Sequence, residues 1–206
     1  MSTDNTQHWE TIYQTKQPNE VSWTQEIPQT SLDFIHSFNL PKSARIIDIG
    51  GGDSKLVDCL LDEGYEHLSV LDISATSIER AKKRLGEKAA KVTWIVSDIT
   101  TFQPQTPYDL WHDRAAFHFL TSPEQISAYK EIVEKAVTGY MIIGTFSENG
   151  PKKCSGLDIV QYSKESLVKT FEDGFTPEQC LYSDHVTPFQ TVQNFVFCSF
   201  KRKPKN

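Results

Sequence analysis

The segment Arg45–Ser54, RIIDIGGGDS, constrains the fold of this 206-residue chain more than any other part. Its isoleucines form a short β-branched run that is typical of a buried strand, and the run contains one acid, Asp48. The strand leads directly into three glycines, Gly50, Gly51 and Gly52. Glycines allow a sharp backbone turn and a close approach by a ligand. An amphipathic helix is predicted over residues 55–62, and a strand, glycine turn and helix in this order are typical of a nucleotide-like cofactor site.

Two further predicted strands also end in acids. They are His67–Asp72, HLSVLD, and Val92–Asp98, VTWIVSD, with a helix expected over Ala75–Leu85 between them. An acid at the end of the second strand bonds ribose hydroxyls in dinucleotide folds. The repetition predicts parallel β/α units.

The rest of the chain continues this alternation. Before the first strand we predict helical segments around Trp9–Tyr13 and over residues 31–38. After the third strand we predict the strand Tyr108–His112, the helix Pro123–Val137 capped by Ser122, the strand Gly139–Phe146, the helix Lys164–Phe171 capped by Ser163, and a hairpin of Cys180–Val186 and Asn194–Arg202. We expect one domain over residues 1–206, with a cap at 1–40 and an α/β core at 41–206.

Composition excludes several classes of protein. No apolar run is long enough to span a membrane, and the polar start MSTDNTQHW does not resemble a signal peptide. A net charge of −6 disfavours a large surface that tracks phosphates, and therefore nucleic-acid partners. The sequence indicates nothing about oligomeric state.

The four cysteines, Cys59, Cys154, Cys180 and Cys198, are widely scattered. Cys59 and Cys198 lie in apolar patterns, so we expect free buried thiols there. No Cys/His spacing suggests a metal site, and the usage of cysteine favours a cytoplasmic protein.

From about Ile46 to Phe200 the chain resembles the class I S-adenosylmethionine (SAM) dependent methyltransferases. The first motif of that family is matched by Asp48, Gly50 and Gly52, while Ser54 stands where a last glycine is usual. The resemblance implies a three-layer Rossmann-like α/β fold with a helical cap at the N-terminus. Its seven-stranded sheet has the order 3-2-1-4-5-7-6 with strand seven antiparallel.

The resemblance also implies SAM as the cofactor. Asp72 would accept the ribose hydroxyls, Asp98 the adenine amino group, and Asp48 would face the methionyl ammonium. The full set of expected cofactor residues is Asp48, Gly50, Gly51, Gly52, Asp72, Ile73, Asp98, Ile99, His112 and Trp23. A nucleotide-dependent dehydrogenase is a rival interpretation, weakened because the glycine spacing is not G-x-G-x-x-G and no second catalytic domain follows.

The end of the fourth predicted strand, HDRAAFHFL, lies where an acceptor would bind beside the cofactor. We expect catalytic roles for His112, Asp113 and Arg114, in orienting or deprotonating the acceptor; the alternative is an ion pair of Asp113 that fixes the loop. For His118 alone, a structural histidine is the favoured interpretation. The expected acceptor-binding residues are Phe117, His118, Tyr13 and Cys154.

Two other segments are candidates for covering the site. The aromatic segment that contains Trp9, Tyr13, Val21 and Trp23 resembles the cap that closes over SAM in small-molecule and protein-lysine methyltransferases of this class, although these residues can also simply pack the cap onto the core. The second is the long loop at residues 147–163, which follows a strand end and contains Cys154.

Three functions fit these observations. The first is methyl transfer to a small molecule, indicated by the compact chain without an added recognition domain. The second is methylation of protein lysine, which is indicated by the negative net charge and by the Asp113–Arg114 pair. The third is a non-catalytic SAM-binding regulator. Methylation of nucleic-acid bases is disfavoured, because no N/D-P-P-Y/F motif follows the fourth strand.

Overall fold

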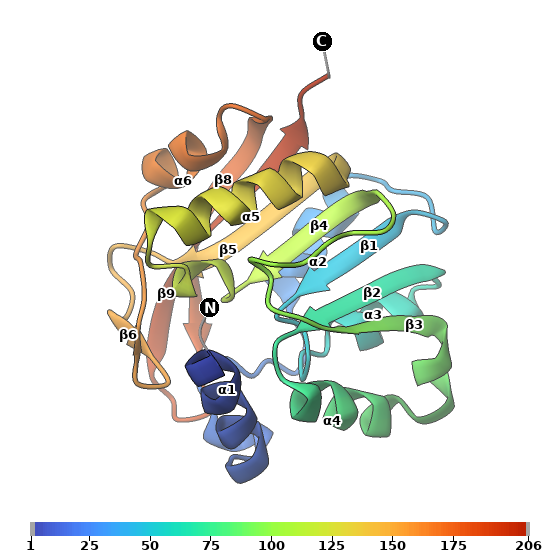
Figure 1. Cartoon of the computed structure of the whole chain (residues 1–206), viewed down its shortest axis with the longest axis vertical. Coiled ribbons are helices and arrows are strands. Elements are labelled where there is room, and N and C mark those ends of the chain that lie inside the picture. The colour runs from blue at the N-terminus through green and yellow to red at the C-terminus, as the bar shows by residue number, and fades with distance from the viewer. Residues whose placement is uncertain (1–2, 205–206) are drawn as a thin grey trace.

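The computed structural model describes residues 3–204 (Figure 1). Its helices are α1 (Thr3–Thr15), α2 (Gln29–Ser37), α3 (Leu56–Asp62), α4 (Ala75–Leu85), α5 (Pro123–Ala136) and α6 (Lys164–Phe171). Its strands are β1 (Arg45–Ile49), β2 (His67–Asp72), β3 (Val92–Val96), β4 (Tyr108–Arg114), β5 (Val137–Phe146), β6 (Lys153–Cys154), β7 (Leu157–Asp158), β8 (Phe175–Val186) and β9 (Val192–Arg202). Short 3-10 turns lie at Pro18–Glu20, Gly86–Lys91 and Phe117–Phe119.

The main sheet has seven strands in the order β3-β2-β1-β4-β5-β9-β8. Strands β1 to β5 pair in parallel, and β9 runs antiparallel to both β5 and β8. Counted along the sheet strands alone, this is the predicted order 3-2-1-4-5-7-6 with strand seven antiparallel, so the predicted fold class is confirmed. The order reverses between β1 and β4, where open α/β sheets bind their ligands.

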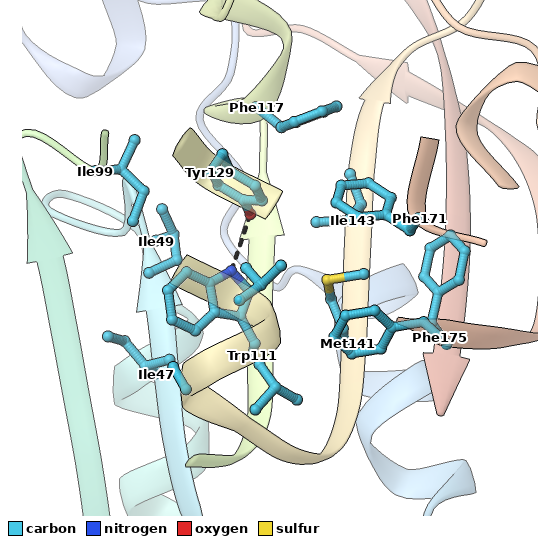
Figure 2. Close-up of a cluster of buried hydrophobic side chains, with 14 of the residues drawn as sticks. Ile47, Ile49, Ile99, Trp111, Phe117, Tyr129, Met141, Ile143, Phe171 and Phe175 are labelled. Atoms are coloured by element: carbon cyan, nitrogen blue, oxygen red, sulfur yellow. Dashed lines mark hydrogen bonds between the residues drawn. The ribbon is translucent and has the colours of Figure 1, made fainter. Parts of the chain in front are cut away.

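Helices cover both faces of the sheet (Figure 1). On one face, α2 and α3 pack against β1, β2 and β4 through one buried apolar cluster. On the other face, α5 and α6 pack over a second cluster centred on Trp111, whose indole N–H donates to the hydroxyl of Tyr129 at 2.9 Å (Figure 2). The three layers leave the carboxyl ends of the strands open, and α1 lies beyond these ends (Figure 1).

Strand β4 is two residues longer than the sequence pattern indicated. It continues past His112 to Arg114, because Asp113 and Arg114 pair with Ile143 and Gly144 of β5. Side chains alternate across a strand, so Asp113 points to the opposite face from its two neighbours. This alternation decides which of the predicted residues reach the site.

The expected free thiol at Cys198 is wrong. Cys198 forms a disulfide with Cys180, with 4.2 Å between their Cα atoms. The register of the β8–β9 pair places these two residues directly opposite each other, which the scattered sequence positions did not reveal. Cys59 is free but only partly buried, and Cys154 is free and buried. The cysteine argument for a cytoplasmic protein therefore loses its basis.

No helix within residues 3–204 is both long enough and apolar enough to cross a membrane.

Candidate cofactor and acceptor site

One pocket lies over the carboxyl ends of the central strands and beneath the N-terminal helices. Its walls combine the glycine turn, the ends of β2 and β4, the segment after β3, and aromatic residues of the cap. Of the residues predicted from sequence, the pocket is lined by Tyr13, Trp23, Asp48, Gly50, Gly51, Asp72, Ile73, Asp98, Ile99, His112, Arg114 and Cys154. The fold therefore brings together residues from six separate parts of the chain: the cap, the glycine turn, the ends of β2 and β4, the segment after β3, and the loop that contains Cys154.

The glycine turn is tightly held against β2. The amides of Gly50 and Gly51 both donate to the carbonyl of Leu71, at 2.7 and 3.3 Å. Gly50 has a φ of +65°, a conformation that favours glycine. A Cβ added at Gly51 would lie 2.2 Å from Oδ2 of Asp48, so this glycine makes room for the carboxylate.

Asp72 lies at the end of β2 and is buried. Its carboxylate accepts hydrogen bonds from the amides of Gly52, at 3.0 Å, and Ser74, at 2.8 Å. Burial raises the pKa of Asp72 to about 6, although these hydrogen bonds lower it. Gly52 does not line the pocket itself; a Cβ there would lie 2.7 Å from Oδ2 of Asp72, so Gly52 fits the turn to that carboxylate. Two donors leave lone pairs of the carboxylate for ligand hydroxyls.

The segment after β3 supplies the next part of the wall. Asp98 lies there, and its Oδ1 accepts from the amide of Thr100 at 2.8 Å and from its hydroxyl at 2.7 Å. Ile73 and Ile99 line the same part of the pocket. A carboxylate beside two aliphatic side chains suits a flat ring that carries an amino group, because the ring contacts the side chains and the amino group donates.

Sequence reasoning missed the residues that fix the glycine turn from outside. Arg84 of α4 donates to the Asp53 carboxylate at 2.7 Å, to Asp58 at 2.8 Å and to the carbonyl of Ser54 at 2.7 Å. Arg80 adds an ion pair with Asp53 at 3.5 Å. Both arginines lie on the polar side of a predicted helix, and nothing in the sequence assigns them a partner about 30 residues away.

His112 connects the core to the cap. Its Nδ1 donates to Oδ1 of Asp48 at 2.7 Å, and its Nε2 shares a hydrogen bond with the hydroxyl of Ser31 at 2.8 Å. All three residues are buried and line the pocket. The other oxygen of the carboxylate, Oδ2 of Asp48, is buried without a partner among the described residues. Such an oxygen suits a ligand cation or donor, because an unsatisfied buried carboxylate oxygen is costly.

Aromatic rings from the cap form the roof of the pocket. The Trp9 ring lies 5.0 Å from that of Phe119 and 5.8 Å from that of Trp23, and Tyr13 lies 6.3 Å from both tryptophans, measured between centroids. The faces of aromatic rings attract cations, and the roof keeps water away. Val21, the one aliphatic residue among the four predicted cap residues, is buried but does not line the pocket.

Glu10 docks α1 onto the core. Its carboxylate accepts from the amide of Ala75 at 2.5 Å and from the hydroxyl of Thr76. Burial by itself raises the pKa of Glu10, but hydrogen bonds from the first turn of α4 lower it by more, so the net shift of the pKa is downward. The helix that carries Trp9 and Tyr13 is therefore attached at the N-terminus of α4, where negative charge is stabilising.

Arg114 and Cys154 also line the pocket. Arg114 donates to the carbonyl of Trp23 at 3.0 Å, and its guanidinium lies 5.0 Å from the centre of the Phe195 ring. Burial raises the pKa of the Cys154 thiol to about 12, although Arg114 lowers it. Cys154 is therefore a neutral wall residue at neutral pH.

Besides Gly52, three predicted site residues do not line the pocket: Asp113, Phe117 and His118. Asp113 faces α5, where its Oδ1 accepts from the amides of Ala116 and Phe117 at 3.1 and 3.0 Å, and its Oδ2 from the Tyr129 hydroxyl at 2.8 Å. The alternative that Asp113 fixes the loop is the one that the contacts support, though through amides and Tyr129 and not through an ion pair. Phe117 packs against the Tyr129 ring. His118 is buried against Phe146, and burial, with Arg114, lowers its pKa to about 3. Their placement follows from the alternation of β4 and the turn after it.

Comparisons with known proteins agree with this architecture. Residues 46–139 match a family model described as a methyltransferase domain. A solved structure, magnesium protoporphyrin IX methyltransferase from Synechocystis PCC 6803 with bound SAH, superimposes with a TM-score of 0.68 at 17% identity, over 98% of this chain and 95% of that one. The family model, the order of the sheet and this structural likeness together support a class I SAM-dependent methyltransferase.

Two curated methyltransferases match parts of the sequence. A malonyl-[acyl-carrier protein] O-methyltransferase of Anoxybacillus flavithermus is 35% identical over 105 residues, which is 50% of this chain and 39% of that protein. An eEF1A lysine and N-terminal methyltransferase of Mus musculus is 25% identical over 122 residues, which is 58% of this chain and 17% of that protein. The chain spans two fifths or less of the length of these two relatives.

The residues of the pocket fit SAM. The unpartnered oxygen of Asp48 is suited to an ammonium, Asp72 has lone pairs for hydroxyls, and Asp98 lies beside the two isoleucines. The absence of side chains at Gly50 and Gly51 keeps the turn open between them. Among residues 3–204 no group of three or more His, Cys, Asp or Glu side chains is placed to hold a metal ion.

Proposed function

We propose that this protein transfers a methyl group from SAM to a small-molecule acceptor. The observation that carries the proposal is the continuity of one covered pocket. The acids Asp72, Asp98 and Asp48 line this pocket together with Arg114 and Cys154. These acids are the groups that an adenosyl amino acid needs, and the rest of the pocket leaves a place for a compact molecule beside it.

The bound cofactor supplies a methyl group on a cationic sulfur. The residues of this chain bind and orient the cofactor. Asp72 accepts hydrogen bonds from the ribose hydroxyls, and Asp98 accepts one from the adenine amino group. Asp48 stabilises the methionyl ammonium through its unpartnered oxygen. The aromatic roof excludes water and attracts the positive charge, which favours a displacement over hydrolysis.

His112 has a positioning role in this proposal. Both of its ring nitrogens already form hydrogen bonds, one to Asp48 and one to Ser31. It orients the carboxylate of Asp48 and joins it to the cap. Deprotonation of the acceptor by His112 would first require the bond to Ser31 to break.

Methylation of a protein lysine is the second candidate, and the similarity to the mouse eEF1A lysine and N-terminal methyltransferase favours it. Two observations speak against it. Asp113, one of the two residues that suggested it, faces away from the pocket. Arg114 places a positive charge in the acceptor part of the pocket, where it would repel a lysine ammonium.

The test begins with binding of S-adenosylhomocysteine (SAH) by calorimetry, with Asp72→Ala as the matched variant. Radiolabelled SAM is then incubated with the protein and a cell lysate, which is separated by ultrafiltration. Label in the small-molecule fraction supports the proposal. Label on protein favours the lysine alternative, binding without transfer favours a non-catalytic regulator, and lack of SAH binding overturns all three.

A further inference from the structure

Arg114 is a buried cation without an anionic partner. Its Nη2 is buried and forms no hydrogen bond to the described residues, while Nη1 donates only to the carbonyl of Trp23. No carboxylate among the described residues forms an ion pair with it, in contrast to Arg84, which has two. The residue nevertheless lines the pocket and is only partly buried as a whole, so a bound molecule can reach it.

The groups around Arg114 leave its charge uncompensated. They are the Phe195 ring, the Cys154 thiol, and the imidazoles of His118 and His185. Burial lowers the pKa of Arg114 to about 10, so it stays charged at neutral pH, and burial with Arg114 lowers the pKa values of both histidines, which stay neutral. Asp48 is the acid that acts on it electrostatically, and one oxygen of Asp48 is bonded to His112. A buried charge of this kind costs stability, and that cost is removed when an anion binds.

The position of Arg114 assigns this anion to the acceptor and not to the adenosine. Arg114 contacts Phe195 of β9 and Trp23 of the cap, on the β5–β9 side of β4. Asp72 and Asp98 lie on the other side, at β2 and after β3. The wall near Arg114 is apolar, with Phe146, Phe195 and Cys154.

Resting on the proposed function, we propose that Arg114 binds the carboxylate of the acceptor, which is a small carboxylic acid with an apolar body. The guanidinium presents parallel N–H groups that match the two oxygens of a carboxylate. The aromatic wall contacts the apolar part. The neutral thiol and imidazoles nearby offer no competing charge.

The same chemistry exists in the cofactor, whose methionyl group also carries a carboxylate, so the experiment separates the two sources. SAH and 5′-methylthioadenosine, which lacks the amino acid, are titrated into wild type and Arg114→Met by calorimetry. If Arg114 binds the acceptor, Arg114→Met should bind SAH and 5′-methylthioadenosine with affinities within about twofold of wild type. A tenfold weakening of SAH with no change for 5′-methylthioadenosine would assign Arg114 to the cofactor and overturn the proposal.

The second measurement uses the SAH-saturated protein and matched pairs of probes: phenylacetate and phenylacetamide, indole-3-acetate and indole-3-acetamide, octanoate and octanamide. Binding is followed by ligand-observed NMR. We expect each carboxylate that binds to bind at least tenfold more tightly than its amide, and this preference to vanish in Arg114→Met. Arg114→Lys retains charge without the fork and should keep only part of the preference.

Arg202→Met is the matched control. Arg202 also lies against an aromatic ring, Phe175 at 5.1 Å, and donates to backbone carbonyls, but it lies outside the pocket. The variant should keep the carboxylate preference of wild type. Equal binding of acids and amides by wild type would overturn this inference, and the proposed function would still stand if the protein bound SAH. Failure of the protein to bind SAH would overturn the proposed function itself.

Discussion

Nδ1 of His112 lies 2.7 Å from Oδ1 of Asp48, which joins the fourth strand of the chain to the strand that leads into the glycine turn. The two residues are direct neighbours in the register of β1 and β4. Ser31 completes the connection from α2. A ligand that binds near Asp48 is therefore coupled to the position of the cap through one imidazole.

His112→Leu should destabilise the protein by about 3 kcal/mol, because it leaves the Asp48 carboxylate buried without its donor. Ser31→Ala should cost about 1 kcal/mol, since it removes one buried hydrogen bond. Urea denaturation monitored by tryptophan fluorescence measures both. Ser37→Ala is the control on the same helix, because the Ser37 hydroxyl donates to the local carbonyl of Phe34. Equal effects of Ser31→Ala and Ser37→Ala would show that the connection to the cap carries no energy.

Asp72→Ala should weaken SAH binding by about 1–3 kcal/mol, through loss of the ribose hydrogen bonds. The pH dependence is a sharper test. The raised pKa of Asp72, about 6, means that the carboxyl group is mostly protonated at pH 5 and mostly ionised at pH 7.5. The ribose hydroxyls donate to the ionised form, so SAH affinity should rise with pH up to about 7, by at most about tenfold per unit.

Asp72→Asn should bind SAH weakly at every pH and lose this rise. Calorimetry between pH 5 and 8 measures it. Asp62→Asn changes an exposed carboxylate that pairs with Lys88, so it controls for the altered net charge and should follow wild type. A wild-type affinity that is flat over this range would argue against a ribose contact at Asp72.

Glu10→Ala should loosen α1, because it removes the acceptor for the first amides of α4. We expect a loss of about 0.5–2 kcal/mol in stability, the usual range for a helix cap. Amide exchange over residues 5–15 should become faster, and SAH should dissociate more quickly as the aromatic roof opens. Glu79 lies on the exposed side of α4 and pairs with Lys82, so the control variant Glu79→Ala should change neither rate. Unchanged exchange in Glu10→Ala would mean that α1 is held by its aromatic contacts alone.

The local parts of the fold could be predicted because their signals are local. Helices α4 and α6 begin and end where the sequence indicated, since Ser74 and Ser163 cap them through their own side chains. Strand β8 was underestimated. It begins at Phe175, five residues before the predicted start at Cys180. Its first residues, FTPEQ, include a proline and polar side chains, which an edge strand tolerates.

The site was predicted where one motif supplied it and missed where distant segments meet. Ending the fourth strand at His112 suggested that His112, Asp113 and Arg114 all face the ligand, whereas the longer β4 sends Asp113 to the other face. The contacts of Glu10 with α4 and of Ser31 with His112 join residues 65 and 81 positions apart. Such pairings depend on the packed tertiary structure, and single-residue patterns carry no record of them.

Asp113 makes a last prediction, about stability and pH. Burial raises its pKa to about 6, above the value of about 3.9 expected in the unfolded chain. The folded state therefore favours the protonated form, so the contribution of Asp113 to stability is fully present below pH 4 and is lost as the pH rises through 6. Asp113→Asn cannot titrate, so wild type should lose about 1–3 kcal/mol more than this variant between pH 4.5 and 7.5. Urea denaturation at the two pH values measures the difference, with Asp62→Asn as the control for charge. Parallel losses in wild type and Asp113→Asn would show that the bonds from Tyr129 and the amides of Ala116 and Phe117 compensate the buried charge fully.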